Sequence, residues 1–290
     1  MEVSAAVVKE LRDKTGLGMM ICKQAIIDAN GDMTVAIENL RKQGQATAVK
    51  RADKAAKEGK VTIVSDATTA CVYEVNSETD FVARNDDFVA FVDTLGKVLI
   101  EKKPADINAA KAIVAQSMGN ITIEARVTEL IGKIGENIMF RRYAKVDASG
   151  ANEKLFTYNH GNGKIGVVVK LSATAGLDSA AMADLGKDLA MQVAASNPMA
   201  ADSDAISPEV IAKEKEIYFT QAQTSGKPEK IWDKIVEGKL VKFFQEVTLV
   251  GQPFVKNPEI SIAQRIAETE KELSSKIKVL SFVRMERGAE

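Results

Sequence analysis

The sequence has little of the chemistry that most enzymes and metalloproteins carry. Among 290 residues there is one histidine, His160, and there are two cysteines, Cys22 and Cys71, far apart and outside any CxxC pattern. Two such cysteines provide neither a metal-binding framework nor a disulfide scaffold, and free thiols suit a reducing cytoplasm. Because no nucleophile motif accompanies the histidine, catalysis by a general acid or base is poorly supplied, and no catalytic, cofactor or metal site is predicted.

Neither sign of charge dominates, and no apolar run is long enough to span a bilayer. Lysine and arginine total 39 against 40 aspartate and glutamate, so bulk attraction to nucleic acid or to an anionic membrane is not expected. The N-terminal stretch lacks the apolar region and cleavage pattern of a secretory signal. Hydrophobic residues make up 46% and charged residues 27%, which is typical of a globular chain with two or three domains. We expect a cytoplasmic protein.

Three short helices are predicted over residues 4–43. Ser4 and Asp32 are suitable N-caps for the first and the third, and glycines separate the first from the second. The third is expected to end at Gly44. A bundle this small is marginal alone but useful as a docking module.

Two features of this region leave alternatives open. Met19 and Met20 follow two glycines, and methionine packs adaptably at interfaces, although the pair could instead fill the core of the bundle. Residues 41–60 are rich in lysine, arginine and alanine, which predicts a solvated helix or linker. A nucleic-acid patch is less favoured because no aromatic residue is interleaved.

The middle of the chain alternates between strand and helix patterns. Strands are predicted at 61–64, 70–75 and 137–147, and helices at 88–99, 111–118 and 122–130. A strand pair around GNGKIG (161–166) and a helix over 179–196 follow. GNGKIG matches a dinucleotide-binding pattern, but it precedes a strand, which favours a hairpin turn. Leu-Gly-Lys occurs in two of the helices, a weak internal similarity that suggests two related α+β subdomains.

Residues 207–247 predict two helices joined by the turn SGKPEK, with a narrow apolar seam typical of a projecting antiparallel hairpin. Ser207 and Pro208 form a favourable helix start. The seam residues expected are Val210, Ile211, Ile217, Phe219, Ile231, Ile235, Leu240 and Phe243. Trp232 is predicted to be a packing anchor. A last helix and a last strand complete the chain.

The stretch SETDFVARND (77–86) places an apolar pair, Phe81 and Val82, in a markedly polar segment. The pair either belongs to the chain's own core or is kept to enter another protein. With several binding surfaces and little catalytic chemistry elsewhere, the second reading is favoured.

Several motifs together resemble the elongation factor Ts family, in family order and over nearly the whole chain. They are VKELRDKTGLGMM (8–20), ANGDMTVAIENLRKQG (29–44), SETDFVARN (77–85), KIGENIMFRR (133–142), YNHGNGKIGVVV (158–169), AASNP (194–198) and GQPFVKNP (251–258). The resemblance implies a nucleotide exchange factor for the translational GTPase elongation factor Tu. Some members carry a further helical module after the last strand, and the sequence here ends with SFVRMERGAE (281–290).

The resemblance also implies site residues. Thr79, Asp80, Phe81 and Val82 form the element that enters the GTPase, where the phenylalanine and aspartate disturb the Mg²⁺ site so that GDP leaves and GTP rebinds. The partner-docking residues expected are Lys9, Arg12, Thr15, Gly18, Met19, Met20 and His160. A homodimer or a two-to-two complex is possible. The alternative is a scaffold or chaperone-like protein of the same architecture without exchange activity.

The expected fold is α+β: a three-helix N-terminal domain, a core of two related subdomains and a coiled-coil hairpin. The expected division is an N-terminal UBA-like docking domain at 1–50, a linker at 51–60, core subdomains at 61–145 and 146–206, a hairpin insertion at 207–247 and a C-terminal part of the core at 248–290.

Overall fold

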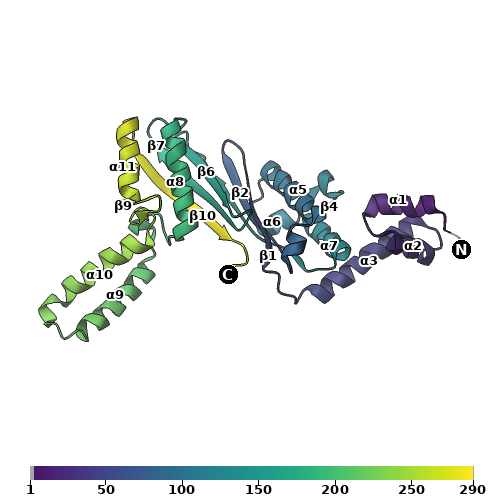
Figure 1. Cartoon of the computed structure of the whole chain (residues 1–290), viewed down its shortest axis with the longest axis horizontal. Helices are drawn as coiled ribbons and strands as arrows, with labels where there is room; N and C mark the ends of the chain where they lie inside the picture. The colour runs from purple at the N-terminus through teal and green to yellow at the C-terminus, as the bar shows by residue number, and fades with distance from the viewer. Residues whose placement is uncertain (1–2, 290) are drawn as a thin grey trace.

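The chain is elongated, with three helices at its N-terminal end and a projecting pair of helices at the other (Figure 1). This arrangement comes from a computed structural model that describes residues 3–289. Helices and small antiparallel sheets alternate along the chain, which confirms the predicted α+β class. Among the described residues, no helix is both long enough and apolar enough to cross a membrane.

The N-terminal helices form the predicted small bundle, called the N-terminal module below. They are α1 (Ala5–Thr15), α2 (Met19–Asp28) and α3 (Met33–Arg51). The Ser4 hydroxyl accepts a hydrogen bond from the Val7 amide, and the Asp32 carboxylate accepts from two amides of α3, so both predicted caps are formed. The module has a hydrophobic core of its own, separate from the cores of the rest of the chain, and this core includes Leu11, Cys22, Ile26 and Leu40.

The predicted end of the third helix at Gly44 is wrong, since α3 continues for two more turns to Arg51. Gly44 is buried against Gly132 of α7 (Ile123–Ile134), where the missing side chain lets the two helix backbones approach closely. Tertiary packing therefore outweighs the low intrinsic helix propensity of glycine.

The first sheet is antiparallel, in the order β1-β2-β5. Its strands are β1 (Glu58–Ser65), β2 (Thr69–Ser77) and β5 (Ile138–Asp147), as the sequence predicts within a few residues. The core on one face is shared with α4 (Asp80–Ala83), α5 (Asp86–Lys102) and α7. Every residue of β2 is buried, which makes it the central strand.

The predicted helix at 111–118 is wrong. The segment contains the end of α6 (Ile107–Lys111), the two-residue strand β3 (Val114–Ala115) and a 3₁₀ turn at Gln116–Met118. Strand β3 pairs with β4 (Ile121–Thr122) through left-handed residues Gly119 and Asn120. The Gly-Asn dipeptide is a turn signal that outweighs the apolar spacing before it.

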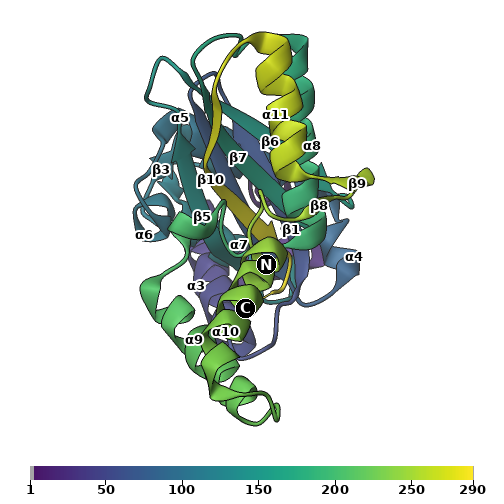
Figure 2. The same cartoon turned by 90° about the vertical axis from the view of Figure 1, so that its left-hand side faces the viewer.

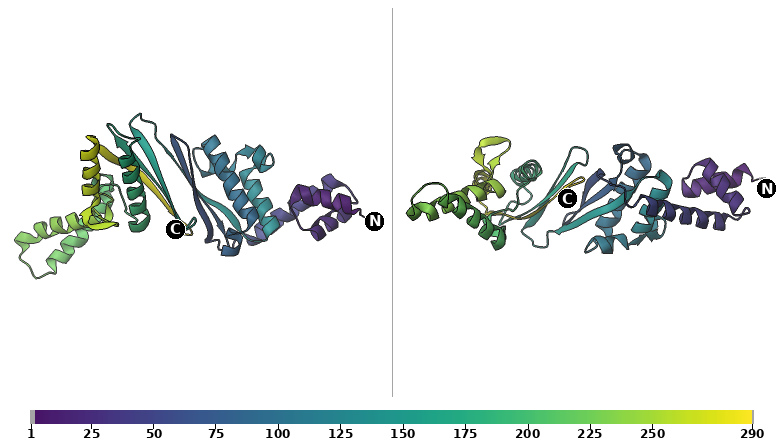
Figure 3. Two further views of the ribbon diagram at one scale, coloured as in Figure 1. Left: turned by 45° about the horizontal axis from the view of Figure 1, so that its top comes forward. Right: turned by 90° about the horizontal axis from the view of Figure 1, so that it is seen from below.

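The second sheet is also antiparallel, in the order β10-β7-β6. Its strands are β6 (Glu153–His160), β7 (Ile165–Ala173) and β10 (Ile277–Glu286), and the helices α8 (Ala180–Ser196) and α11 (Ile262–Leu273) cover its outer face (Figures 1 and 3). The inner faces of the two sheets meet over a third core that includes Val61, Val72 and Val168. Four layers result, with helices outside and sheets inside.

The first four residues of GNGKIG form the hairpin turn between β6 and β7, as predicted, and its last two begin β7. Gly161, Asn162 and Gly163 all adopt left-handed backbone conformations, which explains the choice of residues. The turn lies on the first sheet, because the Val61 amide donates a 2.8 Å hydrogen bond to the Gly163 carbonyl.

Helices α9 (Pro208–Gln223) and α10 (Trp232–Val247) pack against each other and project from the body (Figure 2). Their seam differs from the predicted one: Ala222, Val236 and Leu240 are buried, whereas Ile217 and Phe219 remain exposed. Trp232 packs edge-to-face on Phe219 and donates its indole N–H to the Lys227 carbonyl, as expected for an anchor. Two short strands, β8 (Pro253–Phe254) and β9 (Asn257–Ser261), lead to α11.

Candidate partner-binding site

A single helical turn, α4, follows the buried strand β2 and carries the segment Thr79 to Val82. Thr79 is its N-cap and accepts from the Val82 amide. Both oxygens of Glu136 hold Thr79 in place: one accepts from the Thr79 amide at 3.0 Å and the other from its hydroxyl at 2.8 Å. Charge-assisted hydrogen bonds of this kind are among the stronger ones, so the turn is fixed at its start.

Phe81 and Val82 are separated by the turn. Phe81 is 80% exposed, whereas Val82 is 9% exposed and packs in the core of the first sheet together with Ala83. The expectation that the segment as a whole is exposed is therefore wrong for Val82. A helical turn points successive side chains about 100° apart, which lets one side chain anchor the turn while its neighbour protrudes.

Asp80 forms an ion pair with Arg84 at 2.9 Å, one turn further along. Both side chains reach solvent, and exposed pairs of this type contribute little to stability. The carboxylate can therefore exchange this partner for another cation at small cost.

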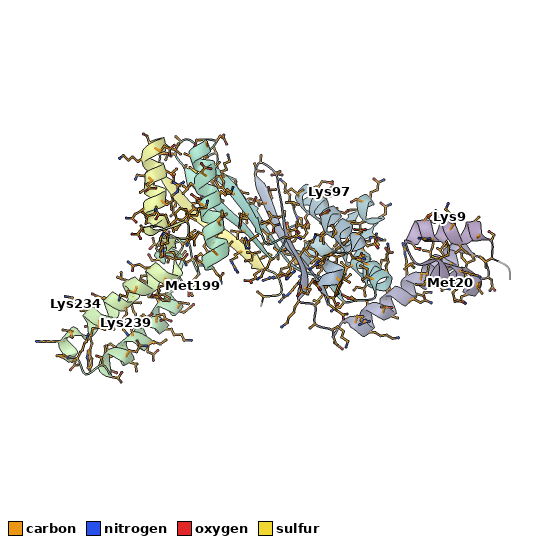
Figure 4. All side chains as sticks on the ribbon, in the orientation of Figure 1. Lys9, Met20, Lys97, Met199, Lys234 and Lys239 are labelled. Carbon is orange, nitrogen blue, oxygen red and sulfur yellow. The ribbon has the colours of Figure 1, made fainter. Side chains whose placement is uncertain are left out.

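The predicted docking residues of the N-terminal module do not form one compact patch. Met19 and Met20 are exposed at the start of α2, so they do not fill the bundle core, while Figure 4 shows Lys9 on the opposite edge of the module from Met20. The Thr15 hydroxyl donates to the Leu11 carbonyl at 2.8 Å. Thr15 thus organises the turn between α1 and α2, where Gly18 is the N-cap of α2.

The structure brings this turn next to the exposed phenylalanine. A hollow of about 370 Å³ is lined by Gly16 and Gly18 on the module and by Phe81, Lys133 and Asp87 among others on the body. The Lys133 ammonium pairs with Asp87 at 2.6 Å and lies against Gly16, where a Cβ atom would come within 2.6 Å of it. Part of the module and α4 therefore form one continuous surface.

His160 is not part of this surface. It lies at the end of β6 in the second sheet, is exposed, and its Nδ1 is 2.9 Å from the Tyr158 hydroxyl. Residues of the hollow do not include it. His160 therefore lies outside the surface that α4 forms with the module.

The surface is suited to contact. Within residues 3–289, no group of three or more histidine, cysteine, aspartate or glutamate side chains is placed to hold a metal ion. What the site presents is an exposed aromatic ring on a fixed turn, a replaceable carboxylate and two exposed methionines.

The comparisons with known proteins agree with this picture. The family profile described as "Elongation factor TS" matches residues 78–289. Curated relatives named elongation factor Ts include those of Syntrophotalea carbinolica (42% identity, 99% of this chain and 94% of the relative), Clostridium novyi (43%, 99% and 93%) and Chlorobium phaeobacteroides (42%, 99% and 99%). The chain belongs to the elongation factor Ts family.

Membership of the elongation factor Ts family confirms the resemblance and the function class predicted with it. The family is one of nucleotide exchange factors in translation elongation, which are not enzymes. The sparse catalytic chemistry of the sequence agrees with this class.

Sequence reasoning missed the residues that hold the candidate site together. Glu136 fixes Thr79, and Glu78 accepts from the Asn137 amide at 2.6 Å, so SETDFVARN and KIGENIMFRR are joined directly. Lys133, from the same second motif, reaches Asp87. The co-occurrence of two polar motifs was the available signal, but only the fold shows that they are in contact.

Proposed function

We propose that the chain binds elongation factor Tu in its GDP state and promotes GDP release by disturbing the Mg²⁺ and nucleotide site of that GTPase, so that GTP can rebind. The observation that carries the proposal is the 80% exposure of Phe81 on a turn that is otherwise anchored. Large exposed apolar side chains on fixed supports are typical of binding hot spots.

The anchoring gives the ring its mechanical role. Phe81 can displace groups of the partner only if α4 keeps its position on contact. Glu136 holds α4 at its start, and the buried side chains of Val82 and Ala83 hold it from behind. Asp80 adds a negative charge beside the ring. A carboxylate brought near a phosphate-bound Mg²⁺ competes for the ion or for its ligands, and that ion holds the nucleotide phosphates.

Exchange then follows from linkage. A factor that weakens nucleotide binding to its partner by some ratio is bound more weakly by the nucleotide-loaded partner by the same ratio. The chain must therefore hold the empty GTPase well through surfaces that do not conflict with nucleotide. The docking set, with Met19 and Met20 exposed on the N-terminal module and His160 on the second sheet, supports this role.

The finer architecture belongs to the same proposal. We assign residues 1–50 to a docking domain and 51–60 to a linker. Residues 61–145 form one half of the core, and residues 146–206 together with 248–290 form the related second half. Residues 207–247 form a coiled-coil hairpin. The two sheets with separate cores and the packed pair of α9 and α10 support this division. We also place the protein in the cytoplasm and allow for a homodimer or a two-to-two complex with the GTPase.

The direct test is stopped-flow release of fluorescent GDP from elongation factor Tu. We expect the chain to accelerate release, and Phe81→Ala to slow the accelerated rate by at least about thirtyfold, as for loss of a hot-spot side chain worth about 2 kcal/mol or more. Met199→Ala, which removes another exposed apolar side chain near the hairpin base, is the matched control and should leave the rate unchanged. Tight binding without any acceleration would instead support a scaffold.

A further inference from the structure

Helices α3 and α7 cross at a contact between two glycines. A Cβ atom added to Gly132 would lie 2.7 Å from the Gly44 Cα, a distance that real Cβ atoms do not show. A Cβ atom added to Gly44 would meet its nearest neighbours only at 3.8 Å. The crossing is therefore a backbone-to-backbone contact that is tight on the Gly132 side and tolerant on the Gly44 side.

This crossing is the main attachment of the N-terminal module to the body. The module has its own core, separate from that of the first sheet. Besides the glycine contact, the attachment includes ion pairs of Arg41 with Glu129 at 3.2 Å and of Arg51 with Glu78 at 3.5 Å. These side chains are partly exposed and give little directional restraint, whereas close-packed backbones define an angle.

The angle at the crossing determines where the module places its contact residues. Gly18, which directly precedes Met19, lines the same hollow as Phe81. A change in the tilt of α3 would alter how the turn between α1 and α2 meets α4, because Gly16 of that turn lies against Lys133, the residue that follows Gly132. Figure 1 shows this end of α1 facing the body.

We infer that Gly132 is a positioning residue for nucleotide exchange: its contact with Gly44 sets the module at the angle at which Met19, Met20 and Phe81 engage one GTPase together. The inference rests on the proposed function. When two contact regions are joined rigidly, the second contact forms at high effective concentration, and this gain is lost if the geometry prevents both from engaging. Phe81 itself keeps its anchoring in α4.

The kinetic consequence is specific. Gly132→Ala should raise the factor concentration needed for half-maximal GDP release by at least about tenfold, since loss of simultaneous engagement can cost 10²–10⁴-fold. The maximal release rate should change by less than about twofold, because the ring still reaches the nucleotide site when the complex is saturated. Gly44→Ala is the matched control at the same crossing and should behave like the unsubstituted chain.

A second readout reports the geometry directly. Spin labels on Lys9→Cys in the module and Lys97→Cys on α5 are exposed positions on the two bodies (Figure 4), and the native Cys22 and Cys71 are buried. We expect the interlabel distance distribution to shift or broaden in Gly132→Ala and to be unchanged in Gly44→Ala. If Gly132→Ala does not fold, Gly44→Leu opens the crossing from the other helix and should give the same two effects.

The outcomes separate this inference from the proposed function. If the unsubstituted chain accelerates release but Gly132→Ala matches Gly44→Ala in half-saturation and in distance, the positioning role is wrong while exchange stands. A shifted distance with unchanged half-saturation also overturns it. If the unsubstituted chain accelerates nothing, the proposed function fails and the positioning role with it.

Discussion

Phe81 and Val82 show that adjacent apolar residues can have opposite roles. The sequence correctly marks the pair as unusual in a polar segment, but exposure depends on where the helical turn begins, and Thr79 with Glu136 decides that. Glu136 lies 57 positions away, so no local pattern could assign the two side chains to different sides. The exposure of Phe81 agrees with its predicted role in binding, and the burial of Val82 does not.

The two side chains should separate stability from exchange. Val82→Ala should lower the free energy of unfolding by about 1–3 kcal/mol, because it removes buried methyl groups from the first core. Phe81→Ala should change it by less than about 0.5 kcal/mol, because the ring is in solvent. Urea denaturation of both variants measures the difference. A large loss of stability in Phe81→Ala would show that the ring packs in the core, and it would contradict the proposal that the ring enters the GTPase.

At the level of elements, glycines inside helices explain what the sequence could and could not predict. The repeated Leu-Gly-Lys has a physical basis: a Cβ atom would lie 2.4 Å from the Tyr73 hydroxyl at Gly96 and 2.1 Å from the Phe156 ring at Gly186. In both helices the glycine admits an aromatic ring from the sheet below. The same residue type was misread at Gly44 as a helix end, because its packing partner is 88 positions away on α7.

Strands and amphipathic helices were predicted well because their periodicity is local. The first core and the sheet hairpin follow from such patterns. The helix predicted at 111–118 was wrong because the elements there are too short to show a period. A helix of five residues ends at Lys111, and a strand of two residues and a 3₁₀ turn follow it. The predicted seam between α9 and α10 was wrong for another reason. Small residues such as Ala222 are buried where the two helices approach closely, while larger apolar side chains remain exposed to solvent.

Two glycine-to-alanine substitutions should therefore have opposite effects on stability. Gly186→Ala forces a methyl group into the Phe156 ring and should cost about 1–3 kcal/mol by overpacking. Gly238→Ala on exposed α10 meets nothing within 4 Å and should stabilise by about 0.5–1 kcal/mol through helix propensity. Thermal melts of both test this. Equal shifts in the two would mean that the ring moves aside freely.

Over the whole molecule, carboxylates in both halves of the core make the free energy of unfolding depend on pH. The Lys103 side chain lowers the pKa of Asp66, the Lys170 side chain lowers that of Glu153, and the Ile277 amide followed by Lys276 lowers that of Glu270. Their unfolded-state pKa values are 3.8 for Asp66 and 4.5 for the two glutamates. Each folded pKa is the lower one, so this contribution is complete above pH 4.5 and is lost as pH falls through the folded values.

The melting temperature should therefore be insensitive to these groups near pH 7 and fall with acidification below about pH 4.5. The triple variant Asp66→Asn, Glu153→Gln, Glu270→Gln should lose stability near neutral pH and show a shallower fall between pH 5 and 3. Melting curves over this range measure both slopes. Parallel slopes in the two proteins would show that other carboxylates control acid unfolding.

The two sheets are also joined by a buried carboxylate, and this gives the last prediction. Glu74 in β2 is fully buried, pairs with Arg142 of β5 at 2.6 Å and accepts from the Gly288 amide at 2.7 Å, just beyond β10. Arg142 also donates to the Glu286 carbonyl, so one cluster connects the first sheet to the C-terminal strand of the second.

Removing one partner of a buried pair leaves the other uncompensated, so Glu74→Ala should cost about 3–5 kcal/mol. Gly288→Ala should also destabilise, because its left-handed backbone disfavours a side chain and a Cβ atom would lie 2.5 Å from the Lys57 carbonyl oxygen. The double variant should lose less than the sum, since both act on one cluster. Urea denaturation of the three variants measures the coupling, and strict additivity would show that the C-terminal segment and Glu74 stabilise the sheets independently.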